Sequence, residues 1–203
     1  MAEIEVKQLS IRDKNEVVTI LFNAFRSSPI MNYFFGDKYQ KSGKYLMQYI
    51  CDLAEISDSF LLGAFLNGEL KGVASITPSE SERNSQTEAI DSLNEQLAIA
   101  VGEDVILRIE KYSQVKKINV PKQSHFYLDI LGVMPEYQGQ GIGKAIIKKL
   151  HKISQESYQS YGVALETGTE NNVSIYQHLG YLITATTNID NTKFWFMFQP
   201  NNA

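Results

Sequence analysis

The sequence predicts a mixed α/β or α+β fold built on one central sheet. Segments with the two-residue periodicity of strands alternate along the chain with segments that have the 3.6-residue periodicity of helices. The clearest strand pair is a hairpin over 60–66 and 70–77, because its two apolar runs are joined by Asn67-Gly68, which favours a tight turn. The clearest helix covers about residues 141–158 and follows a glycine-rich loop.

The first half of the chain is predicted to contain a strand and two helices before that hairpin. Residues 4–9 alternate apolar and polar side chains, as a half-buried strand does. Ser10 is expected to cap a helix that the run 27–29, with its proline, ends. Residues 33–36 are interpreted as an aromatic loop. A second helix is expected from residue 37 or 42 to about residue 56, with one face formed by Tyr45, Tyr49, Leu53 and Ile56.

Residues 79–123 interrupt this regular alternation. They open with a polar stretch, 79–85, and continue with two helical patterns that Gly102 separates. We interpret them as a helical insertion within one domain that spans residues 1–203. The elements expected after it are a strand over 125–133 stopped by Pro135, the helix over 141–158, a strand over 162–167, a short helix over 172–178 ended by Gly180, and a hairpin over 181–187 and 193–198.

Composition limits the classes of function. The chain has 19 Lys and Arg against 23 Asp and Glu, a formal charge of -4, whereas a general nucleic-acid binder needs a basic face. No apolar run approaches the length of a membrane span, and the N-terminal residues lack a basic segment followed by an apolar one. The one cysteine, Cys51, lies in an apolar-periodic stretch and cannot form an internal disulfide. We therefore expect a cytoplasmic protein without nucleic-acid or membrane partners.

The most informative segment is the run from Leu131 to Lys144, LGVMPEYQGQGIGK. It reads as strand, turn, glycine loop and helix. Glycines let backbone N–H groups turn toward an anion, and a helix N-terminus adds unpaired N–H groups, so the segment indicates a phosphate or pyrophosphate cradle. A tight glycine turn without a ligand is the alternative. Lys144 stands where a dinucleotide fingerprint needs its last glycine, and the spacing and Ser/Thr of a P-loop are absent.

Gln138, Gly141 and Gly143, placed after the strand exit at Val133 and Pro135, resemble the acetyl-CoA signature of the GNAT N-acetyltransferase superfamily. The resemblance continues at 165–167, Asn172, Tyr176 and 179–181, and it runs over about residues 126–198. The runs 126–128, 132–133 and 165–167 are closest in pattern to the branch that contains puromycin N-acetyltransferase and its fungal-type relatives. The resemblance implies a single GNAT-like domain whose central, mostly antiparallel twisted sheet has six to seven strands flanked by helices.

The same resemblance implies direct transfer of an acetyl group from acetyl-CoA to a primary amine, most simply of a small molecule, in a ternary complex. Tyr176 would lie near the sulfur and protonate the leaving thiolate. The cofactor-binding residues it implies are Leu131, Gly132 and Val133 along the pantetheine arm, Gln138, Gly139, Gln140, Gly141, Ile142, Gly143 and Lys144 at the pyrophosphate, and Asn172 at the arm or at the loop before the last helix. Gly132 is a candidate independently of the resemblance, since glycine inside a strand often marks a bulge or the close approach of a ligand.

Such a transfer needs a base, because a free alkylamine is mostly protonated at neutral pH. Asp129 and Glu166 are the candidates, since each is a carboxylate inside a predicted strand, where burial is expensive. Each is equally well interpreted as the partner of a buried Arg, Tyr or backbone group. Asp129 is expected on the strand face of Tyr127, Leu131 and Val133. His125 is interpreted as solvated or at a strand edge, and His151 and His178 as structural. No spacing indicates a metal site.

Two other functions stay open at this point: a non-catalytic acyl-CoA-binding or regulatory module, and an acetyltransferase acting on protein N-termini or lysines. The acceptor is not readable from the sequence, although residues 33–35 and the insertion are candidate walls of its pocket. Lys144 and Lys148 are candidates for the adenosine 3′-phosphate, with a solvated helix face as the alternative. Both a monomer and a homodimer are compatible with the chain, because C-terminal edge strands could pair.

Overall fold

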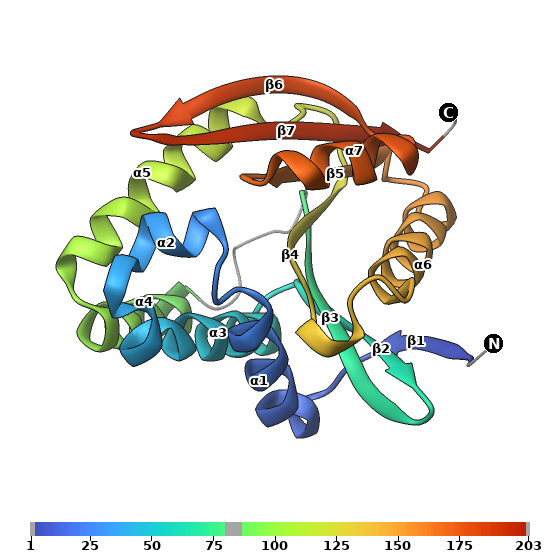
Figure 1. Cartoon of the computed structure of the whole chain (residues 1–203). Coiled ribbons are helices and arrows are strands. Elements are labelled where there is room, and N and C mark those ends of the chain that lie inside the picture. The colour runs from blue at the N-terminus through green and yellow to red at the C-terminus, as the bar shows by residue number, and fades with distance from the viewer. Residues whose placement is uncertain (1–2, 80–86, 202–203) are drawn as a thin grey trace.

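One twisted sheet of seven strands runs through the centre of the computed structural model, which describes residues 3–79 and 87–201 (Figure 1). The strand order is β1-β2-β3-β4-β5-β7-β6, and every neighbouring pair is antiparallel except β4 and β5. This confirms the expected mostly antiparallel sheet. The strands are β1 (Ile4–Gln8), β2 (Phe60–Leu66), β3 (Glu69–Pro78), β4 (Phe126–Val133), β5 (Gly162–Thr167), β6 (Leu182–Ile189) and β7 (Thr192–Pro200).

Helices cover the sheet on both faces (Figure 1). One face is covered by α1 (Lys14–Ala24) and α3 (Tyr39–Ile56), against which α2 (Pro29–Phe35), α4 (Thr87–Val101) and α5 (Glu103–Asn119) pack. The other face is covered by α6 (Ile142–Glu156) and α7 (Glu170–His178). Three short 3-10 turns, at Ile11–Asp13, Gly36–Lys38 and Pro135–Tyr137, complete the helical segments that the described residues form. None of these helices is both long and apolar enough to cross a bilayer.

Helix α6 is held against the sheet by one apolar stripe. Ile142, Ile146 and Leu150 are fully buried, and each contributes about 1.5–3 kcal/mol by leaving water. The close approach of the helix depends on Gly72 in β3, where a Cβ atom would lie 2.6 Å from Cγ2 of Ile142. The N-terminus of α6, and with it the glycine loop, is therefore fixed next to the end of β4.

The parallel strands β4 and β5 separate part of the way along their length. Residues 126–128 of β4 pair with residues 163–165 of β5. Beyond these residues, the strand that β5 pairs with is β7. Strand β4 continues to pair with β3 as far as Val133. Over residues 129–133 its other edge has no strand partner among the described residues, so an opening in the ladder lies directly before the glycine loop.

Strand β4 also contains a bulge at Asp129. Consecutive residues of β3, Ser75 and Ile76, pair with Ile130 and Leu128, so Asp129 is the extra residue. Beyond the bulge, Leu131 and Val133 pack in the α6 cluster, whereas Tyr127 belongs to a cluster on the opposite face. The expectation that Asp129 shares a face with Leu131 and Val133 was therefore wrong, because the bulge reverses the alternation of side chains.

Two further expectations are corrected in the N-terminal half. Residues 33–36 are not a loop, since Tyr33 to Phe35 form the end of α2. Pro29 stops one helix but also occupies the first turn of the next, where its missing N–H costs nothing. In α3 the buried stripe is Tyr39, Leu46, Met47 and Cys51, whereas Tyr45 is 38% exposed. That helix carries apolar residues on two adjacent stripes, and the stripe that meets α1 and the sheet is the buried one.

The local turn signals were confirmed. Asn67 and Gly68 both have positive φ, 54° and 82°, as a type I′ turn requires. Gly102, with φ of 92°, separates α4 from α5. These two helices lie between β3 and β4 in the sequence, where a helical insertion was predicted. Residues 80–85 of the polar stretch lie outside the described residues.

Candidate functional site

The glycine loop between β4 and α6 presents its backbone to open space. Gly139 and Gly141 have φ of 77° and 85°, and a Cβ atom at either position would meet nothing within 4 Å. Helix α6 begins at Ile142, so the N–H groups of its first turn have no partner within the helix. Unpaired N–H groups at a helix start, reached through left-handed glycines, form a cradle that fits a phosphate or pyrophosphate group.

The side chains of two glutamines in this loop fold back and bond to nearby backbone carbonyls. The Gln138 Nε2 amide donates to the carbonyl of Val133 at 3.1 Å, and the Gln140 Nε2 amide donates to the carbonyl of Glu136 at 3.4 Å. Both side chains hold the loop in shape and leave the backbone N–H groups after Gln138 for an anion, whereas the Gln138 N–H itself donates to the carbonyl of Pro135 at 3.3 Å.

The unpaired edge of β4 can accept an extended ligand. Leu131 and Val133 pair with Ala74 and Gly72 of β3 on one side, while the β5 side has no strand partner here. An extended molecule with amide groups can add to such an edge as a further strand does. Gly132 is explained differently from the sequence interpretation, since a Cβ atom there would lie 3.0 Å from both Ala24 and Leu21 of α1. The close neighbour of this glycine is the protein's own helix.

Helix α7 places Asn172 and Tyr176 beside the divergence of β4 and β5. The Asn172 Nδ2 amide donates to Thr167 Oγ1 at 3.5 Å, and the backbone N–H of Thr169 donates to the same oxygen at 3.2 Å. Asn172 was expected either to contact the cofactor arm or to fix the loop before the last helix. These contacts fit the second role, because they tie Asn172 to the β5–α7 loop. Tyr176 packs edge-on against Tyr181, with ring centroids 5.6 Å apart. Burial, with the nearby charge of Glu166, raises the pKa of Tyr176 to about 12, so its hydroxyl keeps its proton at neutral pH.

Asp129 is held in a polar chain that runs into the protein. The hydroxyl of Thr77 donates to its Oδ2 at 2.6 Å, and the ammonium of Lys116 lies 2.7 Å from its Oδ1. The hydroxyls of Ser59 and Thr77 are 2.9 Å apart, and because Thr77 donates to Asp129, Ser59 must be the donor to Thr77. Both oxygens of the Asp129 carboxylate therefore have partners.

Glu166 lies between two tyrosines. The hydroxyls of Tyr112, from α5, and of Tyr127, from β4, donate to its two carboxylate oxygens. Burial raises the pKa of Glu166, and the positive charge of Lys116 opposes that shift. The two tyrosine donors also oppose the shift, and a carboxylate whose pKa stays raised is a stronger proton acceptor than a solvated one.

Lys116 joins the two carboxylates into one network. It pairs with Asp129, and its Nζ atom lies 3.7 Å from the centroid of the Tyr127 ring whose hydroxyl binds Glu166. Sequence reasoning missed both Tyr112 and Lys116. Both lie in residues 79–123, which were predicted only to be a helical insertion, and no sequence signal relates either one to a glutamate about 50 residues away.

The three histidines have structural contacts, but His125, which was expected to be solvated or at a strand edge, is buried instead. His125 is buried, its Nδ1 atom lies 2.7 Å from the carbonyl of Gln123, and burial lowers its pKa. His151 lies 2.9 Å from the hydroxyl of Tyr181, and burial lowers its pKa to about 4. His178 contacts the carbonyl of Ser174 at 2.6 Å. Over residues 3–79 and 87–201, no three His, Cys, Asp or Glu side chains gather as a metal site would need.

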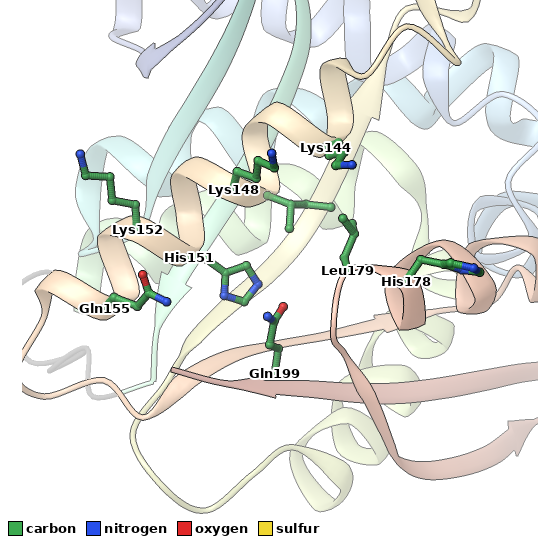
Figure 2. A pocket seen from close by; sticks show the side chains of 9 residues that line it. Lys144, Lys148, His151, Lys152, Gln155, His178, Leu179 and Gln199 are labelled. Atoms are coloured by element: carbon green, nitrogen blue, oxygen red, sulfur yellow. The ribbon is translucent and has the colours of Figure 1, made fainter. Parts of the chain in front are cut away.

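A groove of about 350 Å³ lies along α6, next to the end of α7 and to β7 (Figure 2). Lys144 and Leu179 lie at one end, while His151, Gln155 and Gln199 lie together at the other. Its lining residues are Lys144, Ile147, Lys148, His151, Lys152, Gln155, His178, Leu179 and Gln199. Lys144 and Lys148 are one helical turn apart and follow directly from the glycine loop, so they extend its positive potential along the groove.

Comparisons with known proteins agree on the fold. A sequence model of the acetyltransferase (GNAT) family matches residues 27–181. The structure is similar to that of a histone acetyltransferase HPA2 and related acetyltransferase from Corynebacterium glutamicum, with a TM-score of 0.72 and 18% identity over 98% of this chain and 97% of that chain.

Two other solved structures show the same likeness. The PaiA N-acetyltransferase from Thermoplasma acidophilum, in complex with coenzyme A, has a TM-score of 0.55 and 18% identity over 98% of this chain and 99% of that chain. The polyamine N-acetyltransferase of Drosophila melanogaster, which forms N-acetylagmatine, has a TM-score of 0.61 and 14% identity over 97% of this chain and 98% of that chain. At these identities the likeness shows the fold.

Proposed function

The chain belongs to the acetyltransferase (GNAT) family, whose members use acetyl-CoA, and we propose that it acetylates the primary amine of a small molecule by direct transfer in a ternary complex. One observation carries this proposal. The glycine loop, the unpaired edge of β4, Tyr176 and the half-buried Glu166 all lie around the place where β4 and β5 separate. The structural likeness to a polyamine N-acetyltransferase and to a coenzyme A-bound N-acetyltransferase supports a small amine.

Acetyl-CoA, when bound, supplies the acetyl group as a reactive thioester. In this proposal the backbone of Leu131, Gly132 and Val133 pairs with its amide-bearing arm, and the loop from Gln138 to Lys144 binds its pyrophosphate through N–H groups. Asn172 fixes the loop beside that arm. Lys144 and Lys148, which line the groove in Figure 2, bind the 3′-phosphate. A row of N–H donors with left-handed glycines and nearby lysines fits this ligand.

The proposed chemistry needs an acid and a base from the chain. Tyr176 is the acid, because its hydroxyl keeps its proton and is close enough to Glu166, in β5, to feel its charge. A carboxylate, Asp129 or Glu166, is the base that removes a proton from the amine. The oxyanion that develops is stabilised by a backbone N–H near Val133.

Direct transfer is supported by the state of the one thiol. Cys51 is 2% exposed and lies in α3, packed in the cluster with α1. Burial raises the pKa of the Cys51 thiol to about 11, which keeps it protonated and unreactive. An acetyl group is therefore not expected to rest on this cysteine.

The closer resemblance to the puromycin N-acetyltransferase branch rests on residues 126–128, 132–133 and 165–167 and would place the acceptor among drug-like or nucleoside amines. A protein-directed acetyltransferase is the alternative to a small-molecule enzyme. Turnover of acetyl-CoA over a panel of polyamines, arylalkylamines and aminonucleosides, with acceptor peptides alongside, separates them. The proposal expects turnover on at least one small amine and none on peptides. Coenzyme A binding by calorimetry without turnover on any amine would indicate a binding module instead.

A further inference from the structure

We propose that the hydroxyl of Tyr112, on α5, carries the proton from the acceptor amine to Glu166, and that Tyr127 and Lys116 are positioning residues for this relay. The inference rests on the proposed acetyl transfer and identifies its base. It makes Tyr112 a catalytic residue and assigns part of the acceptor side of the active site to the segment between β3 and β4.

The first observation is that both oxygens of Glu166 are already covered. Tyr112 donates to one oxygen and Tyr127 to the other, so each oxygen already has a tyrosine hydroxyl through which a proton can reach it. A phenolic oxygen accepts a hydrogen bond while its own proton is donated onward. The tyrosines thus act as a bridge between Glu166 and a donor on their far side.

The second observation is that the two tyrosines are not equivalent. Tyr127 belongs to β4, is 5% exposed, and its ring lies against Lys116 and edge-on to His125 at 5.9 Å. Tyr112 projects from α5 and is partly exposed. Its ring meets Phe34 of α2 edge-on at 5.3 Å and lies 5.7 Å from Phe194 of β7. Of the two tyrosines, only Tyr112 has a partly exposed side chain, so we place the acceptor on its side, within a frame of aromatic rings.

The third observation concerns Asp129, the rival base. Its oxygens accept from Thr77 at 2.6 Å and from Lys116 at 2.7 Å, so its negative charge is balanced by a neighbouring cation. The groups that face Glu166 are Tyr112 and Lys116 from α5, Tyr127 and Asp129 from β4, and Tyr176 from α7. Of the two carboxylates, Glu166 is the one held only by neutral hydroxyls, and its pKa is raised by burial, which makes it the stronger base.

The proton transfer balances without any further reagent. The N–H bond of the ammonium group breaks as its proton passes to the Tyr112 oxygen, and the Tyr112 O–H bond breaks as that proton passes to Glu166. Tyr112 is unchanged, the amine is left neutral and nucleophilic, and Glu166 is left protonated. Glu166 later returns the proton to solvent. Tyr176, from α7, gives its proton to the leaving thiolate, and it regains a proton when the acetylated nitrogen releases its second one.

The test compares Tyr112→Phe with wild type in two measurements. The first measurement is the pH profile of kcat/KM. Removing a hydroxyl donor from Glu166 raises the pKa of that carboxyl. The acid limb, which is the part of the profile where kcat/KM falls as the pH is lowered, therefore moves to higher pH whether Tyr112 relays the proton or only positions Glu166. Loss of a relay also lowers the high-pH plateau, by about 100-fold, whereas loss of a mere positioning contact leaves the plateau intact. A retained plateau in Tyr112→Phe would overturn the relay.

The second measurement needs no turnover. Infrared difference spectra of wild type and Glu166→Gln identify the Glu166 carboxyl band, and its titration gives the pKa directly. We expect this pKa to be higher in Tyr112→Phe than in wild type, and an unchanged value would overturn the contact itself. If wild type acetylates no amine, the proposed function fails, and the infrared titration still decides whether Tyr112 binds Glu166.

Two further variants separate the relay from a structural effect. Tyr127→Phe is expected to shift the acid limb to higher pH and to retain the plateau; a plateau lost equally in both variants would contradict the assignment to Tyr112. Tyr39→Phe is the matched control, because Tyr39 is a buried tyrosine whose hydroxyl donates to the Phe22 carbonyl at 2.8 Å, outside the site. It is expected to leave both the plateau and the limb of kcat/KM unchanged.

Discussion

The ammonium of Lys116 pairs with Asp129 at 2.7 Å while it lies 3.7 Å from the ring centroid of Tyr127. One cation on α5 thus neutralises one carboxylate and covers the tyrosine that binds the other. Because α5 and β4 are joined by only a few residues, this helix and the central strand form the network together. The chemistry of the site is therefore shared between the sheet and the segment before it.

Replacing Lys116 by Met is expected to move the acid limb of kcat/KM to higher pH. Lys116 lowers the pKa of Glu166, so its removal lets burial raise that pKa further. The base is then protonated over more of the pH range, and activity is lost from the acidic side first. The pH profile measures this, with Lys7→Met on the edge strand β1 as the control, because Lys7 is exposed and does not line the groove. An acid limb that stays in place would exclude Lys116 as a neighbour of the base.

Replacing Gly141 by Ala is expected to weaken coenzyme A binding by about 10–100-fold, because a Cβ atom would stand where the pyrophosphate meets the N–H groups. Gly68→Ala is a matched control. Gly68 has φ of 82° against 85° for Gly141, and neither site has an atom within 4 Å of the added Cβ. Both variants are expected to lose about 1–2 kcal/mol of stability. Calorimetry in which both bind coenzyme A equally would remove the loop from the cofactor site.

Replacing Gly132 by Ala is expected to act on folding. The added Cβ would lie 3.0 Å from Ala24 and Leu21, so α1 must move away from β4. Overpacking of this kind costs about 1–3 kcal/mol. Urea unfolding measures the loss, and Gly143→Ala is the comparison, since its Cβ would meet Leu131 and Val133 at ordinary contact distance. Equal stability of Gly132→Ala and wild type would contradict the packing explanation.

Replacing Cys51 by Ala is expected to leave kcat unchanged, since the thiol is buried in α3 and its pKa is raised to about 11. For the same reason, native protein is expected to resist alkylation by iodoacetamide at pH 8, and unfolded protein to react fully. Mass spectrometry measures both. An acetyl group found on Cys51 during turnover would replace direct transfer by a covalent route.

Much of the fold was predictable because its signals are short-range. Asn67-Gly68, Gly102 and the glycine loop each determine the backbone within a few residues, and all three turns were found where expected. Pro29 was misinterpreted because the same residue ends one helix and begins another. The orientation of Asp129 depends on a bulge, and a bulge is defined by the register of the partner strand β3, which local periodicity does not contain.

The candidate site was predictable on its cofactor side and much less so on its acceptor side. The loop, Asn172 and Tyr176 follow one another in a fixed order along the chain, so their pattern can be recognised from the sequence. Glu166 and Asp129 were identified as anomalies, since charged residues in strands require partners. The partners themselves, Tyr112 and Lys116, come from a helix 54 and 13 residues away along the chain. Only the packing of α5 against the sheet brings them to the carboxylates.

The most direct test of the account is the rate of acetyl transfer by Tyr176→Phe at saturating acetyl-CoA and amine. The variant loses only the hydroxyl and keeps the ring that packs against Tyr181. We predict that kcat falls by at least about 100-fold, because the leaving group loses its acid, while the affinity for coenzyme A stays within about twofold of wild type. A kcat equal to that of wild type would contradict the assignment of Tyr176 and the arrangement of the site proposed around it.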